Sequence, residues 1–383
     1  MKLLLLPAFA AVLVVAPVQR AHACVALLQA QGGVVEQNGQ VAILSAHDGV
    51  TDNIFVIDVP AAGNAFGVLI PVPEEPVIDP NEVSTAAIDA LEASTRPTFE
   101  RGAADGDSGG CGCGVPLSGD ALGVNRGVIT GDPVDIGPVT AQWVSGTAGN
   151  AVADWLADQG FVLPAGADAV LDAYTNQGLG FLAFTRNETS TGAARVGVKF
   201  TLDGDRRVYA LRMSQIGSAA LMGFTIFVGH EGDAALAPDA PYAQIGVDEL
   251  GDGGIIADGD YKGAVATAVS EAGGKAFVVE SSGPAANLSS DAAALFASGA
   301  FVTRLSTVAA PAELDSDVTF TTASTETVQT FTGLAQPWQP PLPPRPDLSL
   351  SFLLLWLGMR LAARLRLDRT VTAQQRAPAP VRA

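Results

Sequence analysis

The stretch of the sequence with the clearest catalytic pattern is residues 106–110, GDSGG, which holds Ser108 among three glycines. A serine nucleophile needs a general base within hydrogen-bond reach and an acid that orients this base. His47 lies 61 residues before Ser108 and is the candidate base. The flanking glycines would let backbone N–H groups reach a developing oxyanion. The candidate acids are Asp52, Asp58 and Asp79. One interpretation is therefore a serine hydrolase that uses Ser108 and His47.

The same stretch has a simpler explanation in a chain that contains 42 glycines. Chymotrypsin-like enzymes, whose serine loop has this sequence, build their site between two β-barrels and need more chain between histidine and serine. Asp48 and Cys111 stand where those enzymes usually have a cysteine and a proline. Asp, Gly and Ser are also the residues that solvated loops use. We therefore predict that GDSGG is a loop sequence, with the hydrolase as the alternative.

The three cysteines, Cys24, Cys111 and Cys113, suggest a structural disulfide. Export would place them in an oxidising compartment, where Cys24 would pair with Cys111 or Cys113 and leave one thiol over. If Cys24 instead carries a lipid, the other two would bridge each other, stay reduced or bind a metal. A disulfide across one intervening residue is strained and easily reduced. A thiol redox protein that uses Cys111 and Cys113 is therefore a further alternative.

Acidic loops rich in glycine are the weak candidates for a cation site. Calcium takes six to eight oxygen ligands from such loops, but none of them completes the twelve-residue calcium loop with its final glutamate. His47 and His230 are the two histidines after residue 23, which excludes a zinc site of several histidines. We expect no cofactor other than Ca²⁺. The candidate ligands are Asp105, Asp107, Asp258 and Asp260, with similar Asp pairs at 203–205 and 248–252.

The first 23 residues have the pattern of an export signal. Lys2 precedes an apolar stretch over residues 3–18, and Ala21-His22-Ala23 forms an A-x-A cleavage site. Cys24 follows directly, so lipid attachment to Cys24 is an alternative to simple cleavage. The position three before Cys24 is Ala21, whereas lipoprotein signals usually have an aliphatic residue there.

The C-terminal part has the pattern of a membrane attachment. A proline-rich spacer covers residues 336–347, an apolar anchor helix is expected over 348–367, and an Arg-containing tail covers 368–383. The uninterrupted apolar run, 348–359, has twelve residues, and a bilayer crossing needs about 20. The helix would span only if its arginines extend to the headgroups; otherwise it lies in the interface. The expected anchor residues are Leu348, Phe352, Leu355, Trp356, Arg360 and Arg364.

Charge is distributed unevenly along the chain. Nine of the 21 basic and two of the 40 acidic residues lie in the signal and in the segment from Arg345, which leaves 12 basic and 38 acidic residues between them, a net charge of −26. Such a surface repels phosphate backbones, so nucleic acid is excluded as a partner. The expected partners are the membrane and an unidentified envelope protein. The positive C-terminal side favours a cytoplasmic tail with the bulk of the chain outside.

The remaining pattern predicts a strand-rich mixed α+β ectodomain of one or two lobes, 24–235 and 236–335, divided near 234–241. Helices are expected where apolar residues share one face, and Ser84 is the expected cap of the first. The region 102–132 reads as a long Gly/Asp/Cys loop. Strands are expected at 40–47, 53–60, 65–73, 139–144, 180–185, 195–202, 207–213, 222–228, 275–281 and 300–307, and helices at 84–94, 149–160, 261–272 and 291–297. A further short helix is expected after 149–160, with Val170, Leu171 and Tyr174 facing inward.

The serial order of several segments resembles the bacterial exported family catalogued as domain of unknown function 2330. These segments include ACVALLQAQGGVVEQNGQVAILSAHDG, AFGVLIPVPEEP, TRPTFERG, GPVTAQWVSG, AVADWLADQGFVLP, VYALRMSQIGS, AGGKAFVVES and FVTRLSTVAAPAELDSDVTF. One departure is Gly67-Val68-Leu69, where aromatic residues are expected. The resemblance implies an envelope protein, often with a C-terminal anchor, with no assigned activity. We therefore expect an exported, membrane-anchored protein with a binding, scaffold or surface-structural role rather than an enzyme.

Overall fold

The structure is a computed structural model. It describes residues 21–22, 26–29, 37–60, 66–101, 128–147, 149–187, 190, 192–216, 218–251, 256–257, 261–323 and 332–336. All of them belong to one compact unit.

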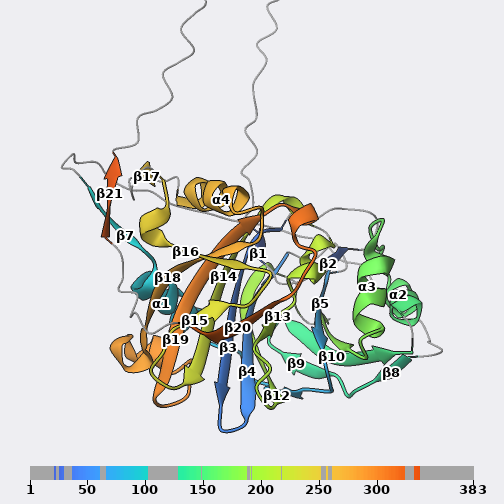
Figure 1. Ribbon diagram of the computed structural model, residues 1–383. Coiled ribbons are helices and arrows are strands. Elements are labelled where there is room, and N and C mark those ends of the chain that lie inside the picture. Colours follow the sequence, from blue (N-terminus) through green and yellow to red (C-terminus); the bar gives the residue numbers. More distant parts are fainter. Residues whose placement is uncertain are drawn as a thin grey trace, which may run out of the picture. The chain divides into compact units, whose positions relative to one another are not determined.

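The main feature of the described residues is a nine-stranded sheet (Figure 1). Its strands pair antiparallel, except that β14 is parallel to β3, β16 to β18, and the short β1 (Ala21–His22) to β3. The strand order is β16 (Ala243–Gly246), β18 (Ala276–Pro284), β19 (Ala300–Ala309), β14 (Ser218–Glu231), β3 (Gln37–His47), β4 (Val50–Val59), β12 (Ala194–Asp203) and β6 (Val77–Ile78).

A two-residue turn joins β3 to β4 at the end of this sheet. Asp48 and Gly49 have φ values of 47° and 78°, and His47 pairs with Val50 across the turn. Positive φ at both central residues is the pattern of a type I′ turn, which matches the twist of the strands and favours Asp-Gly. The turn fixes the hairpin register and therefore the position of His47.

A six-stranded sheet forms the largest apolar core together with one face of the nine-stranded sheet. Because side chains alternate along a strand, Ala42 and Leu44 of β3 enter this core. Helices α2 (Gly149–Asp158) and α3 (Ala167–Thr175) add Val152, Trp155, Leu156, Val170, Leu171 and Tyr174. The sheet consists of β2 (Ala26–Gln29), β5 (Phe66–Val72), β11 (Gly180–Arg186), β10 (Val139–Gly146), β8 (Val128–Thr130) and β9 (Val134–Ile136).

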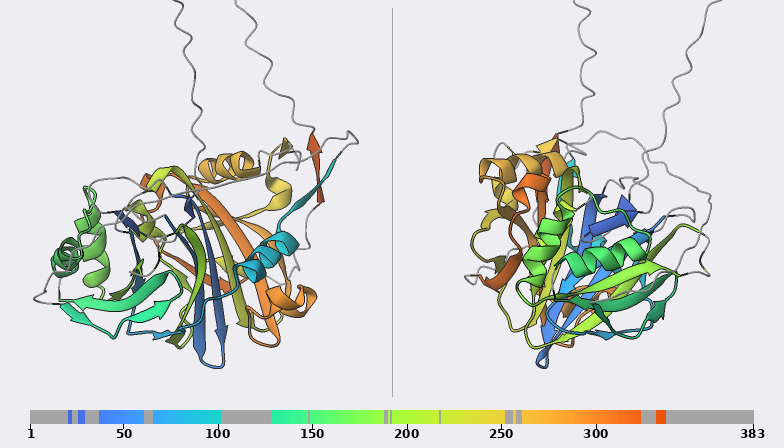
Figure 2. Two further views of the ribbon diagram at one scale, coloured as in Figure 1. Left: turned by 180° about the vertical axis from the view of Figure 1, so that it is seen from behind. Right: turned by 90° about the vertical axis from the view of Figure 1, so that its right-hand side faces the viewer.

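Helices cover the opposite face of the nine-stranded sheet. The alternate residues of β3, Val41 and Ile43, pack in a second cluster with residues of α1 (Thr85–Thr95) and α5 (Ser290–Ala293). Val265 and Val269 of α4 (Tyr261–Glu271) pack on β18 and β19 in a third cluster. Figure 2 shows α1 well apart from α2 and α3 along the sheet. The helix-covered face is the one that carries the candidate site.

Smaller elements complete the described fold. One three-stranded sheet consists of β13 (Val208–Tyr209), β20 (Val318–Thr322) and β15 (Leu236–Pro238), and another of β17 (Ile256–Ala257), β21 (Thr332–Gln336) and β7 (Thr98–Arg101). Short 3₁₀ helices are η2 (Leu211–Gln215), η3 (Val247–Glu249), η4 (Ala285–Asn287) and η5 (Pro311–Glu313).

The structure confirms a strand-rich mixed α+β fold and most predicted elements, with two corrections. Ser84 does cap α1, since its Oγ accepts a hydrogen bond of 3.3 Å from the N–H of Ala87. The strand predicted over 207–213 is wrong beyond Tyr209, because the chain turns into η2, whose Leu211 and Met213 are buried with a spacing that imitates a strand. Residues 128–130, predicted as loop, form β8. The nine-stranded sheet runs across the boundary expected near 234–241.

Candidate functional site

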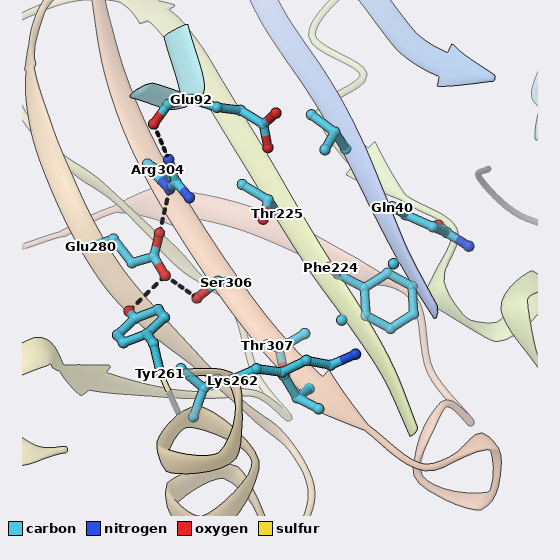
Figure 3. Close-up of a pocket in the computed structure, with 15 residues that line it drawn as sticks. Gln40, Glu92, Phe224, Thr225, Tyr261, Lys262, Glu280, Arg304, Ser306 and Thr307 are labelled. Atoms are coloured by element: carbon cyan, nitrogen blue, oxygen red, sulfur yellow. Dashed lines mark hydrogen bonds and ion pairs between the residues drawn. The ribbon is translucent and has the colours of Figure 1, made fainter. Parts of the chain in front are cut away.

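A cavity of about 500 Å³ opens on the helix-covered face of the nine-stranded sheet, where α1 and α4 approach strands β3, β14, β18 and β19 (Figure 3). Gly39 of β3 and Gly223 of β14 are paired neighbours in the parallel register, and both line the cavity. Neither has a side chain to fill the space between the helices. The glycine pair therefore explains locally why this face is hollow.

A buried ion pair forms one wall of the cavity. Glu280 of β18 is 0% exposed and Arg304 of β19 is 8% exposed. Arg304 Nε donates a hydrogen bond to Glu280 Oε2. Glu280 Oε1 accepts one from Ser306 Oγ and one of 2.6 Å from the Tyr261 hydroxyl. Three donors thus occupy the carboxylate, which suits it to positioning Arg304 and not to accepting a substrate proton.

Arg304 also ties the sheet to the C-terminal end of α1. Its Nη1 donates to the backbone carbonyl of Glu92 at 2.8 Å and to Thr95 Oγ1 at 3.1 Å. A cation near the last carbonyls of a helix interacts favourably with the helix dipole. The guanidinium carbon lies 5.5 Å from the centre of the Phe227 ring. Arg304 is therefore held rigidly at the cavity wall.

Further polar residues line the cavity from the two helices and from the strands: Glu92, Tyr261 and Lys262, and Gln40, Thr225 and Thr307. Burial raises the pKa of Tyr261, and the neighbouring Glu280 carboxylate raises it further, so the hydroxyl stays a donor. Figure 3 shows the Glu92 side chain near Arg304 and Lys262 extending from α4 away from Arg304. The arrangement can hold a molecule by hydrogen bonds and charge, and it presents no activated nucleophile.

His47, the predicted base, lies at the turn end of β3 and does contact a predicted acid. His47 Nε2 is 3.0 Å from Asp52 Oδ2. Asp52 also accepts from Lys199 Nζ at 2.7 Å and from Thr201 Oγ1 at 2.7 Å. Burial alone would raise the pKa of Asp52, but the hydrogen bonds from Lys199, Thr201 and His47 bring this pKa below its ordinary value. The aspartate is thus a charged centre of a local network.

The other two candidate acids are engaged elsewhere. Asp58 lies 4.0 Å from Arg195 Nε, and Asp79 accepts from the N–H and the side chain of Asn81 at 2.9 Å. His47 Nδ1 is buried without a hydrogen-bond partner among the described atoms. His230 contacts the backbone carbonyls of Glu231 and Ala234. Of the three acids, the structure therefore brings Asp52 alone to His47.

Most other predicted site residues lie outside the described part of the chain. This holds for the serine loop, the cysteines, the cation candidates and the anchor: Ser108, Cys24, Cys111, Cys113, Asp105, Asp107, Asp258, Asp260, Leu348, Phe352, Leu355, Trp356, Arg360 and Arg364. In the similar Asp pair at 203–205, Asp205 accepts hydrogen bonds from Arg207 Nε at 2.8 Å and from Arg207 Nη2 at 2.6 Å. Within the described ranges no cluster of three His, Cys, Asp or Glu residues fits a metal.

The sequence did contain a signal for the buried pair that our pattern analysis missed. Glu280 and Arg304 are the charges that lie inside the apolar runs of KAFVVES and AFVTRLST. Charged residues are almost never fully buried unless they are paired. Two opposite charges in predicted core strands therefore predict that the two residues form an ion pair. Their partners on α1 and α4 depend on helix placement and were not predictable from the strands.

No helix among the described residues has the length and apolar character needed to cross a membrane.

Comparison with known proteins gives a family and no individual relative. No curated protein and no solved structure matches the chain significantly. One family model, described as an uncharacterised protein conserved in bacteria (domain of unknown function 2330), matches residues 18–321. The chain therefore belongs to this bacterial family.

Proposed function

We propose that the protein is an exported protein of the bacterial envelope that binds a small ligand in the cavity between α1 and α4. The observation that carries this proposal is the cavity of about 500 Å³ with the buried Glu280–Arg304 pair in its wall. Ligand sites are typically cavities of roughly 300–1,000 Å³, mostly apolar, with a few placed polar groups. This cavity has that size and that composition.

The buried pair supports binding more than it supports stability. Desolvation of two charges often costs as much as their attraction returns, so an ion pair is a weak way to stabilise a core. At the wall of a cavity, however, Glu280 holds the Arg304 guanidinium in one orientation before any ligand arrives. Such preorganisation lowers the entropy that a ligand loses on binding.

Membrane attachment is the second part of the proposal. The export signal over residues 1–23, the spacer over 336–347 and the apolar segment over 348–367 support a chain that is anchored at its C-terminal part with the ectodomain outside. We expect the full chain to fractionate with membranes and to need detergent for release. A chain ending at Gln336 should appear in the soluble envelope fraction; equal fractionation of the two chains would contradict the anchor.

Ligand binding is tested by the melting temperature of the detergent-purified full chain. The panel consists of amino acids, short peptides, sugars, nucleotides and fatty acids at millimolar concentration. A ligand should raise the melting temperature of the wild type. Thr225→Phe fills the cavity and should abolish the shift, while Thr319→Phe, at an exposed strand position of β20, should retain it.

Two results would contradict the binding proposal. One is a panel in which no compound changes the melting temperature of the wild type. The other is a shift that persists in Thr225→Phe. Circular dichroism of both variants establishes that each is folded, so that a lost shift reports the cavity and not unfolding.

A further inference from the structure

A second cavity lies in the largest apolar core, between strands β4 and β12 of the nine-stranded sheet and β5 of the six-stranded sheet. We call it the inter-sheet cavity, and its volume is about 140 Å³. Among the described residues, it shares no lining residue with the larger cavity between α1 and α4. Protein interiors contain few voids larger than a water molecule. A cavity of this size between two packed sheets therefore calls for a ligand that fits it.

The inner walls of the inter-sheet cavity are apolar. Five of its lining side chains are at most 5% exposed: Phe55, Ile70, Val72, Phe200 and Leu202. They come from three strands whose pairing holds them in place. An apolar cavity of about 150 Å³ in a protein core takes up a molecule of the size of benzene. The inter-sheet cavity thus has the volume and the polarity for one small ring.

Aromatic side chains make this wall suited to a flat ligand. Phe55 and Phe200, which both line the cavity, are stacked with ring centroids 5.8 Å apart and planes 3° from parallel. Aromatic rings favour offset or edge-to-face partners at roughly 4.5–7 Å, and such contacts add to the gain from burial. A ring that enters beside Phe55 and Phe200 obtains this contribution, whereas an aliphatic group of the same size does not.

The lining becomes more polar toward solvent, where the cavity opens. Val208 of β13 is 47% exposed, and Arg206 is exposed as well. Asp317 Oδ1 accepts hydrogen bonds from the Tyr174 hydroxyl at 2.6 Å and from the N–H of Arg212 at 3.1 Å. Burial raises the pKa of Asp317, and these hydrogen bonds reverse the rise only in part. Surroundings that disfavour the charge of Asp317 also disfavour a charged ligand.

From this geometry we infer a second binding site, in which the inter-sheet cavity holds a small uncharged molecule with a single aromatic ring. The ring lies against Phe55 and Phe200, and a polar substituent lies toward Asp317 at the opening. A charged ring of the same size would exchange its hydration for an apolar wall, and two fused rings exceed the volume. The inference goes beyond the proposed function, because it concerns a different cavity and a different ligand.

The test is a fluorine NMR titration of 4-fluorophenol with the detergent-purified full chain, with detergent alone as the blank. The fluorine signal should broaden and shift with added protein and saturate. Phenol should compete for the site. Cyclohexanol should bind about two- to tenfold more weakly than phenol, because it lacks the aromatic face. Benzoate should bind at least about tenfold more weakly, because its charge loses hydration. Equal affinities of the three compounds would contradict the inference.

Three variants locate the ring. Ala210 lines the inter-sheet cavity, so Ala210→Phe fills it and should weaken binding of 4-fluorophenol at least about tenfold. Ala157→Phe, at an exposed position of α2, is the matched control and should bind as the wild type does. Thr225→Phe, in the larger cavity, should also leave this binding unchanged. Circular dichroism establishes that each variant is folded.

A change of size selectivity tests the same site without filling it. Leu179 lines the inter-sheet cavity and is half-buried, so Leu179→Ala enlarges the space beside the ring. The wild type should discriminate against 6-fluoro-2-naphthol, which has two fused rings. Leu179→Ala should bind this naphthol at least about tenfold more tightly than the wild type does, because a clash of this kind is relieved. An unchanged affinity for the naphthol would contradict the inference even if Ala210→Phe does not fold.

The outcomes separate this inference from the proposed function. Equal broadening in the wild type and in folded Ala210→Phe would mean that the ring is held by detergent or elsewhere, and the inference would be wrong. Binding lost in Thr225→Phe and kept in Ala210→Phe would place the ring between α1 and α4, which contradicts the inference and supports the proposed function. If no aromatic probe binds while a panel compound still loses its thermal shift in Thr225→Phe, this inference alone is wrong.

Discussion

Glu280 is the extra residue of a β-bulge opposite Arg304. Val279 of β18 pairs with Leu305 of β19, and Ser281 pairs with Arg304, so Glu280 between them has no paired partner in the ladder. Bulges redirect side chains and are frequent next to functional sites. Here the bulge brings the Glu280 carboxylate to the Arg304 guanidinium at the cavity wall.

Breaking this pair should destabilise the protein strongly. Arg304→Met leaves a buried carboxylate without its cation, and Glu280→Met leaves a buried cation, so each should lower the free energy of unfolding by about 3–5 kcal/mol. The loss in the free energy of unfolding of the double variant should be much smaller than the sum of the losses of the two single variants. Urea unfolding of the purified chain measures all three. Lys275→Met, which removes the exposed pair with Asp315, should cost at most ~1 kcal/mol; a similar loss in Arg304→Met would contradict the argument.

The network around Asp52 should make stability depend on acid pH. Its folded-state pKa lies below the ordinary value of 3.8, because hydrogen bonds from Lys199, Thr201 and His47 outweigh burial. A lowered carboxyl pKa contributes stability above pH 3.8 that is lost as the pH falls through the folded-state pKa. Asp52→Asn should therefore flatten the loss of stability below pH 3.8, measured by urea midpoints. An unchanged slope would contradict the network.

Three tyrosines should resist ionisation while the protein is folded. Burial raises the pKa of Tyr174, Tyr242 and Tyr261, and nearby carboxylates raise each of them further. Raised pKa values contribute stability that is present below the ordinary value of 10.0 and is lost as the pH rises above it. In an alkaline absorbance titration, phenolate should appear for these three only as the protein unfolds. Their titration near pH 10.0 in the folded chain would contradict the prediction.

Gly197 of β12 should not tolerate a side chain. A Cβ there would lie 2.6 Å from the carbonyl oxygen of Val83, which is bridged to Gly197. Backbone must then shift, and overpacking of this kind typically costs about 1–3 kcal/mol. Gly197→Ala should lower the thermal midpoint, while Gly283→Ala, also in a strand but with no atom within 4 Å of the new Cβ, should not.

Serine-directed chemistry should fail on this protein. His47 Nε2 is occupied by Asp52, and Nδ1 is buried, so neither nitrogen is placed to activate an incoming hydroxyl. We expect no mass increase of the full chain after exposure to a fluorophosphonate probe. An adduct that disappears in Ser108→Ala would establish the hydrolase alternative.

Local patterns were sufficient to predict most elements, because burial and capping follow from neighbouring residues. The apolar stripe of α2, with Val152, Trp155 and Leu156, and the Ser84 cap of α1 are examples. The error at Leu211 arose because alternating burial also fits a turn that enters the core. The cavity could not be predicted from the sequence, because it depends on the register that aligns Gly39 with Gly223, which lie some 180 residues apart in the chain. No local pattern specifies such a register.

The parallel pairing of β3 with β14 has a consequence for how the chain acquires its structure. Strands β3 and β14, which pair at the centre of the large sheet, are far apart in sequence, and β18 and β19 follow later still. Contacts between distant segments incur the cost of loop closure before they contribute stability, so folds of high contact order form slowly. The nascent chain cannot complete its main sheet until β19 has been synthesised. For the export proposed above, this delay would keep the polypeptide unfolded long enough for threading through a translocation pore.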